Sequence, residues 1–145
     1  MKPLTQAEIS KVIFDILNPS METIVIIDDE ESIRTSLGLM FKREGFNVLT
    51  AGDGKKGMAL FKENQVDLVI TDIVMPEKEG LETILELKKL LPEIPIIAIS
   101  GGGRLAPDGY LEAAKGMGAK YTFKKPFDPD DLLLTVYEAL KTMET

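Results

Sequence analysis

The sequence predicts an α/β domain in which a doubly wound, five-stranded parallel sheet carries helices on both faces. Two observations lead to this fold class. Short β-branched runs alternate along the chain with segments in which apolar residues recur every three or four positions. The alternation is regular from Thr23 onward and gives five strand and helix pairs, which right-handed crossovers join in a sheet of this kind. Periodicity alone leaves the strand order open.

The strands expected at the centre of the sheet are continuous apolar runs, because parallel strands are covered on both faces. These strands span Thr23–Asp28, Asp67–Thr71 and Pro95–Ser100. Two further segments, Phe46–Thr50 and Ala119–Lys124, mix polar with apolar residues. We therefore expect these two strands nearer the edges of the sheet.

The helices between the strands are predicted from apolar residues at helical spacing, and their ends from glycine, proline and acidic residues. The first should stop near Gly45, the second should begin after Gly54, and the third should end at Pro92. The last helix has the clearest start, with Asp128 as its N-cap and Pro129 as its first residue.

A separate amphipathic helix is predicted within residues 1–20. Thr5 and Glu8 form a capping-box pattern at its start. Its apolar residues recur at helical spacing: Ile9, Val12, Ile13, Ile16 and Leu17. We expect residues 1–20 to form this helix and a linker, and residues 21–145 to form one domain. The helix either packs on its own domain or makes a dimer or partner contact, and the sequence leaves both open.

Composition and charge exclude several functional classes. The 145 residues are 44% hydrophobic and 28% charged, as in one globular domain, and include no cysteine. Without cysteine or an apolar signal near Met1, we expect a reducing cytoplasm, and no apolar run approaches the roughly 18 residues that span a bilayer. A net charge of −7 disfavours direct binding to nucleic acid, and the absence of histidine removes the usual general base and zinc ligand.

Polar residues stand at the carboxyl ends of four predicted strands. In chain order they are Asp28-Asp29-Glu30, Thr71-Asp72, Ser100 and Lys124-Lys125. Ligands of open α/β sheets bind outside the carboxyl ends of the strands, where these residues should meet. We therefore expect one pocket with at least three carboxylates, a hydroxyl group and an ammonium group.

Three carboxylates in one pocket repel one another, and each close pair costs about 4 kcal/mol at an effective dielectric constant near 20. A divalent cation removes this repulsion, and a ligand set made only of oxygen atoms is the one that magnesium prefers. Such a cation neutralises an incoming phosphoryl group and holds it in line with an attacking carboxylate. An aspartate is already ionised at neutral pH, so this chemistry needs no histidine base.

Each of these residues also has a purely structural interpretation. The following helix would be stabilised through its dipole by acidic side chains before its N-terminus, namely Asp28, Asp29 and Glu30. Asp72 could be a turn residue. The lysines could be solvated, and the glycines after Ser100 lack the Gly-Lys-Ser/Thr sequence of a nucleotide-binding loop. The four placements together favour a functional site over these separate explanations.

The same residues resemble the receiver domain of bacterial two-component response regulators, of the chemotaxis-regulator type. The resemblance covers Thr23 to Lys141 and rests on four motifs: Asp28-Asp29, Asp72-Ile73-Val74-Met75-Pro76 with Gly80 after it, Ser100, and Lys125-Pro126-Phe127. It implies a flavodoxin-like strand order 2-1-3-4-5 and a cis peptide bond before Pro126.

The resemblance also implies a role for each residue of the site. Asp72 would accept a phosphoryl group from a phosphohistidine on a sensor histidine kinase or a phosphotransfer protein. Lys125, rather than Lys124, would contact the phosphoryl oxygens, and the Ser100 hydroxyl would bond one of them. Magnesium would be held by four groups: Asp28, Asp29, Asp72 and the main-chain carbonyl of Val74.

One departure from the family pattern keeps an alternative open. The family often has an aromatic residue three positions before the lysine, where this chain has Thr122 with Tyr121 beside it. The main interpretation is a domain whose phosphorylation switches its contacts with a downstream protein target. The alternative is a receiver-like interaction scaffold that works without phosphorylation. An aspartyl phosphatase is a further alternative, although Val74 stands where the haloacid dehalogenase-like family has a second aspartate. We expect no enzyme activity beyond the chain's own phosphorylation and dephosphorylation.

Overall fold

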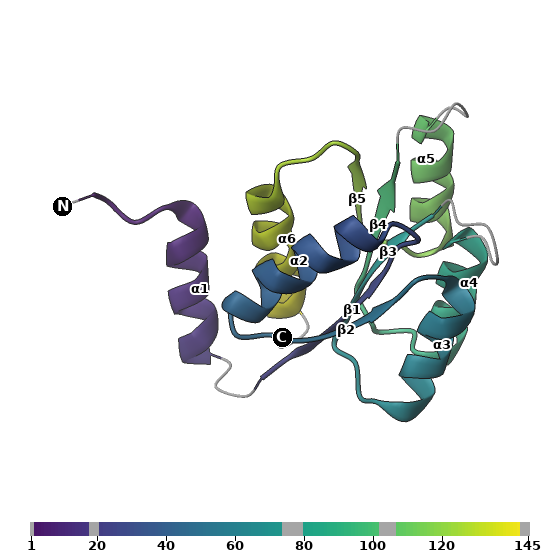
Figure 1. The fold of residues 1–145 in the computed structure, drawn as a ribbon, viewed down its shortest axis with the longest axis horizontal. Helices are drawn as coiled ribbons and strands as arrows, with labels where there is room; N and C mark the ends of the chain where they lie inside the picture. Colours follow the sequence, from purple (N-terminus) through teal and green to yellow (C-terminus); the bar gives the residue numbers. More distant parts are fainter. Residues whose placement is uncertain (1, 18–20, 74–79, 102–106, 143–145) are drawn as a thin grey trace.

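The structure is a computed structural model that describes residues 2–17, 21–73, 80–101 and 107–142. Its centre is a parallel sheet of five strands in the order β2-β1-β3-β4-β5 (Figure 1). The strands are β1 (Thr23–Ile27), β2 (Asn47–Ala51), β3 (Leu68–Asp72), β4 (Ile96–Ser100) and β5 (Tyr121–Lys124). The predicted fold class and the strand order 2-1-3-4-5 are both confirmed.

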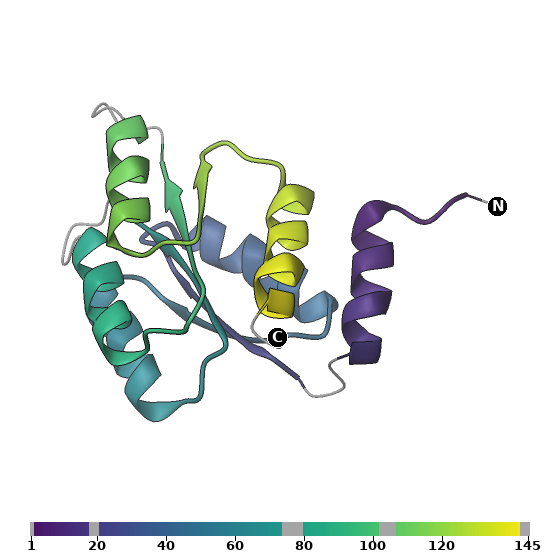
Figure 2. The ribbon, with the colours of Figure 1, turned by 180° about the vertical axis from the view of Figure 1, so that it is seen from behind.

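Helices cover both faces of the sheet, and one more helix precedes the first strand. They are α1 (Gln6–Leu17), α2 (Glu31–Arg43), α3 (Gly54–Glu63), α4 (Gly80–Leu90), α5 (Pro107–Met117) and α6 (Pro129–Thr142). Figures 1 and 2 show α2 and α6 on one side of the sheet and α3, α4 and α5 on the other. None of these helices, in the ranges described, has the length and apolar character needed to span a bilayer.

Two hydrophobic cores lie on opposite faces of the sheet because neighbouring residues of each strand point in opposite directions. Ile24 and Ile26 of β1 enter the core beneath α2 and α6, whereas Val25 and Ile27 enter the core beneath α3, α4 and α5. All five residues of β1, β3 and β4 are buried, as their unbroken apolar sequences predict. The central strands therefore form a rigid support for whatever follows their carboxyl ends.

The helix ends agree with the signals in the sequence. Thr5 and Glu8 form the expected capping box, in which Glu8 N donates to Thr5 Oγ1 at 3.1 Å and Thr5 N donates to Glu8 Oε1 at 3.0 Å. Asp128 accepts a hydrogen bond from Asp130 N at 2.9 Å at the start of α6. Gly45, which follows the C-cap residue Glu44 of α2, has a φ of +95°, a backbone conformation that residues with side chains disfavour.

The N-terminal helix α1 packs on its own domain, which is one of the two arrangements left open by the sequence. The Phe14 ring packs against those of Phe46 and Tyr137, with centroid distances of 5.7 and 5.3 Å, and the latter two rings lie 5.8 Å from each other. Lys11 Nζ donates to the Glu44 main-chain oxygen at 2.9 Å. Phe14 and Lys11 thus help to join α1 to the end of α2 and to α6, and Ala7 packs against the same core.

Candidate functional site

The register of the sheet places the predicted site residues at one edge. Ile27 of β1 is level with Thr71 of β3, so Asp28, which follows β1, lies at the same height as Asp72, the last residue of β3. Ser100 of β4 is level with Lys124 of β5, so Lys125 follows at the same edge. The predicted meeting of these strand ends is confirmed.

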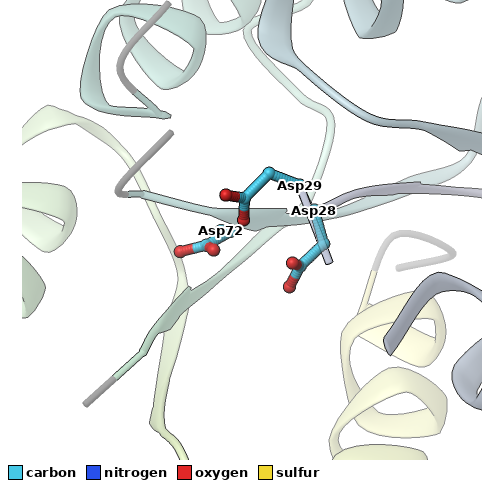
Figure 3. Close-up of side chains that lie close together, drawn as sticks. All are labelled: Asp28, Asp29 and Asp72. Atoms are coloured by element: carbon cyan, nitrogen blue, oxygen red, sulfur yellow. The ribbon is translucent and has the colours of Figure 1, made fainter. Parts of the chain in front are cut away.

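Three carboxylates gather at this edge. One carboxylate oxygen from each of Asp28, Asp29 and Asp72 lies within 4.8 Å of the others (Figure 3). Asp28 is 1% exposed and Asp72 is 4% exposed, while Asp29 is open to solvent. The cluster therefore has two buried anions and one accessible anion, which is a suitable arrangement for an oxygen-ligated divalent cation that approaches from solvent.

Lys125 supplies the positive charge of the site. Its Nζ lies 2.9 Å from Asp28 Oδ2, 3.2 Å from Glu30 Oε1 and 3.6 Å from Asp72 Oδ2. Its side chain is 12% exposed among these carboxylates, whereas Lys124 is exposed. The Lys125–Pro126 peptide bond is cis, as expected.

The pKa values of the buried pair are shifted by burial and by their contact. Burial raises the pKa of Asp28 above its ordinary value, against the opposing effects of the hydrogen bonds from Glu30 N and Lys125. Burial alone would lower the pKa of Lys125, but the hydrogen bond to Asp28 and the charge of Asp72 outweigh it and raise that pKa. Lys125 therefore stays charged and partly neutralises the excess of carboxylates.

Ser100 is 1% exposed at the end of β4, beside the carboxylate cluster at the same sheet edge. The Lys125 main-chain N–H donates to the Ser100 carbonyl at 2.9 Å, which ties the chain after β5 to the end of β4. Val74, whose carbonyl was expected to hold the metal, lies outside the described residues. Tyr121 packs against the core beneath α2 and α6, and Thr122 follows it on the opposite side of the strand.

Two polar contacts of the site were missed in the sequence. Glu30 contacts Lys125, and Arg34 Nη1 donates to the Asp28 main-chain oxygen at 2.8 Å. The spacing between Glu30 and Arg34 is that of adjacent turns of a helix, which would have placed both near the end of β1. Arg34 thus fixes the backbone at the start of the acidic loop.

A comparison with protein-family models decides the family. The model of the response regulator receiver domain matches residues 24–137. The chain belongs to this family. The match begins at the second residue of β1 and ends within α6, so it includes all of the sheet except Thr23 and leaves α1 outside the matched residues.

Curated relatives of this receiver domain are response regulators of greater length. The chain is 32% identical over 118 residues to the transcriptional regulatory protein GlrR of Escherichia coli K12, with 81% of this chain and 26% of the relative covered. It is 32% identical over 124 residues to the response regulator SaeR of Staphylococcus aureus, with 86% and 53% covered. The receiver domain thus spans between a quarter and about half of these relatives.

Solved structures show the same fold. A receiver domain of the CheY-like type from Methanospirillum hungatei superposes with a TM-score of 0.78 at 30% identity, covering 86% of this chain and 98% of that one. NtrX from Brucella abortus superposes with a TM-score of 0.79 at 31% identity, covering 86% of this chain and 28% of that one. The receiver fold of the chain therefore rests on both sequence and structure.

Gly80 brings α4 against the backbone of the receiver site. A Cβ at this position would overlap the Asp72 carbonyl oxygen and Ile73 Cα, and backbone atoms cannot move aside as a flexible side chain does. We expect Gly80→Ala to lower the free energy of unfolding by about 1–3 kcal/mol, as overpacked positions do. Urea denaturation measures this change.

Gly116 offers a matched control within α5, because a Cβ there would meet no atom within 4 Å. Gly116→Ala should leave stability unchanged or raise it by about 0.4–1 kcal/mol through the reduced entropy of the unfolded chain. Equal effects of the two substitutions would show that the close approach at Gly80 is unimportant.

Proposed function

We propose that this receiver domain acts in phosphorelay signalling by accepting a phosphoryl group on Asp72 in a magnesium-dependent reaction. The donor is a phosphohistidine on a sensor histidine kinase or a histidine phosphotransfer protein. One observation carries the proposal: the buried Asp72 carboxylate lies in a cluster with Asp28 and Asp29, 3.6 Å from the Lys125 ammonium group. An acceptor, a cation site and a fixed positive charge thus lie side by side.

The donor set fits magnesium. Asp28, Asp29 and Asp72 would hold the ion through carboxylate oxygens, with the Val74 main-chain carbonyl as the fourth protein ligand. When bound, the ion neutralises the negative charge of the phosphoryl group and orients it for in-line transfer. The burial of Asp28 and Asp72 keeps their oxygen atoms fixed before the ion arrives.

The transfer step uses Asp72 as the nucleophile. A carboxylate oxygen of Asp72 forms a bond to phosphorus while the phosphorus–nitrogen bond of the donor breaks. The electron pair of the broken bond stays with the imidazole nitrogen. Lys125 then exchanges its contact with the Asp72 carboxylate for a phosphoryl oxygen, and the Ser100 hydroxyl donates to another. These new bonds move the ends of β4 and β5, which changes the surface offered to a downstream protein target.

The output of the signal is a change of protein contacts rather than chemistry on an external substrate. The chain assists only its own phosphorylation and dephosphorylation. With a net charge of −7, it makes no direct contact with nucleic acid, although GlrR is named a transcriptional regulatory protein. The cytoplasm, where its kinase partner presents phosphohistidine, is its place of action.

Incubation with acetyl phosphate followed by intact-mass measurement tests the proposal. With magnesium present, the chain should gain one phosphoryl group, and with EDTA present it should gain none. No gain under either condition would favour the interaction scaffold that works without phosphorylation. Sustained release of phosphate from unrelated esters would favour a phosphatase instead.

Glu30 should slow phosphorylation, because its carboxylate holds Lys125 and adds negative charge near the incoming phosphoryl group. Glu30→Gln should therefore raise the rate with acetyl phosphate about two- to five-fold, the range expected for a half-exposed ion pair. Stopped time points read by intact mass measure the rate. Glu31→Gln removes the same charge one residue away, and an equal effect there would assign the change to net charge rather than to the contact with Lys125.

A further inference from the structure

The Arg34 guanidinium group is bound to the main chain of the acidic loop, residues 28–30. Arg34 lies near the start of α2 and is half-buried. Its Nη1 donates a hydrogen bond of 2.8 Å to the Asp28 main-chain oxygen. Within the described ranges Arg34 forms no ion pair with a carboxylate, although this edge of the sheet is rich in them. A hydrogen bond from a charged donor is stronger than one between neutral groups, so the Asp28 carbonyl is firmly held.

The carbonyl that Arg34 holds belongs to the peptide bond between two of the expected magnesium ligands, Asp28 and Asp29. A peptide unit is planar, so its oxygen atom and the Asp29 nitrogen and Cα atoms rotate together. Figure 3 shows the Asp28 and Asp29 side chains gathered beside Asp72, and one oxygen of each lies within 4.8 Å of the others. The orientation of the Asp28 oxygen therefore restricts the direction in which the Asp29 side chain leaves the backbone.

Asp28 is held at several atoms, whereas the Asp29 carboxylate is not. Asp28 N donates to the Ala51 main-chain oxygen at 3.1 Å. The Asp28 carboxylate accepts hydrogen bonds of 2.9 Å from Glu30 N and from Lys125 Nζ. The Asp29 carboxylate is exposed and accepts no hydrogen bond from the part of the chain that the structure describes. Its position therefore depends on the backbone that precedes it.

We propose that Arg34 is a positioning residue for magnesium, which acts by fixing the Asp28–Asp29 peptide and not by touching the ion. This inference rests on the proposed function, in which the carboxylate cluster holds the ion. With the Arg34 bond in place, the Asp29 carboxylate faces the cluster before the ion arrives. Without this bond the peptide rotates more freely, and the ion must order the Asp29 carboxylate as it binds, which lowers the affinity. Groups that orient metal ligands typically change metal affinity by roughly 10- to 100-fold when they are removed.

The positive charge of Arg34 has the opposite effect on magnesium binding. A guanidinium group beside a cation site repels the cation, so removal of the charge alone would strengthen magnesium binding. Removal of the hydrogen bond to the Asp28 carbonyl would weaken it. A purely structural role would lower the melting temperature and leave the affinity unchanged. The sign of the change in affinity therefore separates positioning from the other two effects.

A magnesium titration of the isotope-labelled chain, followed by amide chemical shifts in NMR spectra, measures the dissociation constant directly. Arg34→Met should raise the dissociation constant about ten-fold. Arg43→Met is the matched control, because Arg43 is exposed in the last turn of α2 and its replacement removes the same charge from the same helix. This control should bind magnesium as the unmodified chain does. Melting temperatures measured without magnesium record any loss of stability separately.

Gly52→Ala disturbs the same contact without removing a charge. A Cβ at Gly52 would lie 3.3 Å from Arg34 Nη1, which is closer than most contacts of a Cβ, so the guanidinium group must shift by a few tenths of an ångström. We expect this shift to weaken the bond to the Asp28 carbonyl. The dissociation constant should therefore rise, by a smaller factor than in Arg34→Met. Gly38→Ala is the control, because a Cβ there meets Val48 Cγ1 at an ordinary 3.9 Å.

The role of Arg34 would be overturned by a dissociation constant that is unchanged or lower in Arg34→Met, or by an equal rise in Arg43→Met. If Arg34→Met does not fold, Gly52→Ala decides, and an affinity equal to that of Gly38→Ala would overturn the role. Each of these results leaves the proposed function intact, because the unmodified chain still binds the ion. The proposed function itself would fail if the unmodified chain bound no magnesium.

Discussion

Asp72→Asn should accept no phosphoryl group from acetyl phosphate in the presence of magnesium, whereas the unmodified chain should accept one. The amide of asparagine keeps the shape of the side chain but lacks the ionised oxygen that attacks phosphorus. Intact-mass measurement after incubation checks the result. We expect the loss to be complete within the sensitivity of the measurement, because the two remaining carboxylates of the cluster, Asp28 and Asp29, are the ones that we assign to the magnesium ion.

The folded state should survive this substitution. Asp72 is 4% exposed and belongs to a cluster of three carboxylates. Removing its charge therefore relieves the repulsion between Asp72 and the other two carboxylates. The melting temperature of Asp72→Asn without magnesium should therefore equal or exceed that of the unmodified chain. Asp130→Asn alters an exposed acid in the first turn of α6 and should be phosphorylated normally. A phosphoryl group on Asp72→Asn would contradict the assignment of the acceptor.

Magnesium should stabilise the folded chain against heat. A ligand that binds only the folded state contributes about 1.4 kcal/mol when its concentration is ten times its dissociation constant. For a chain of this size, this contribution corresponds to a rise of about 3–6 °C in melting temperature. Differential scanning calorimetry with magnesium and then with EDTA measures the rise and its reversal.

Asp29→Asn identifies the site at which magnesium acts. Asp29 is the exposed member of the carboxylate cluster, so its replacement removes one ligand without opening a buried cavity. We expect this variant to lose most of the stabilisation by magnesium, while Glu31→Gln retains it. Stabilisation of Asp29→Asn equal to that of the unmodified chain would place the ion elsewhere.

The sequence predicted the fold to the extent that short-range patterns determine it. The unbroken apolar runs of β1, β3 and β4 marked the central strands, and their bounds were predicted to within one residue. The start of α6 followed from Asp128 and Pro129, because capping is a local interaction. Strand order came only from the family resemblance, since periodicity carries no information on which strands are neighbours.

The candidate site was predictable from the sequence because parallel strands end at a common edge, which brings Asp28, Asp72 and Ser100 together. What the sequence could not provide was the direction of long side chains. The contact between Glu30 and Lys125 joins residues 95 positions apart and depends on rotamers. The exposure of Ile9, Val12, Ile13 and Ile16 on α1 could not be predicted either, because an amphipathic pattern does not specify which neighbour covers the apolar face.

The hydrogen bond from the Lys125 main-chain nitrogen to the Ser100 carbonyl has a mechanical consequence. It fastens together the two loops that bear the ammonium group and the hydroxyl group. Neither segment can shift by itself without breaking this hydrogen bond. A displacement of either segment is therefore transmitted to the other, so that the ends of β4 and β5 move together.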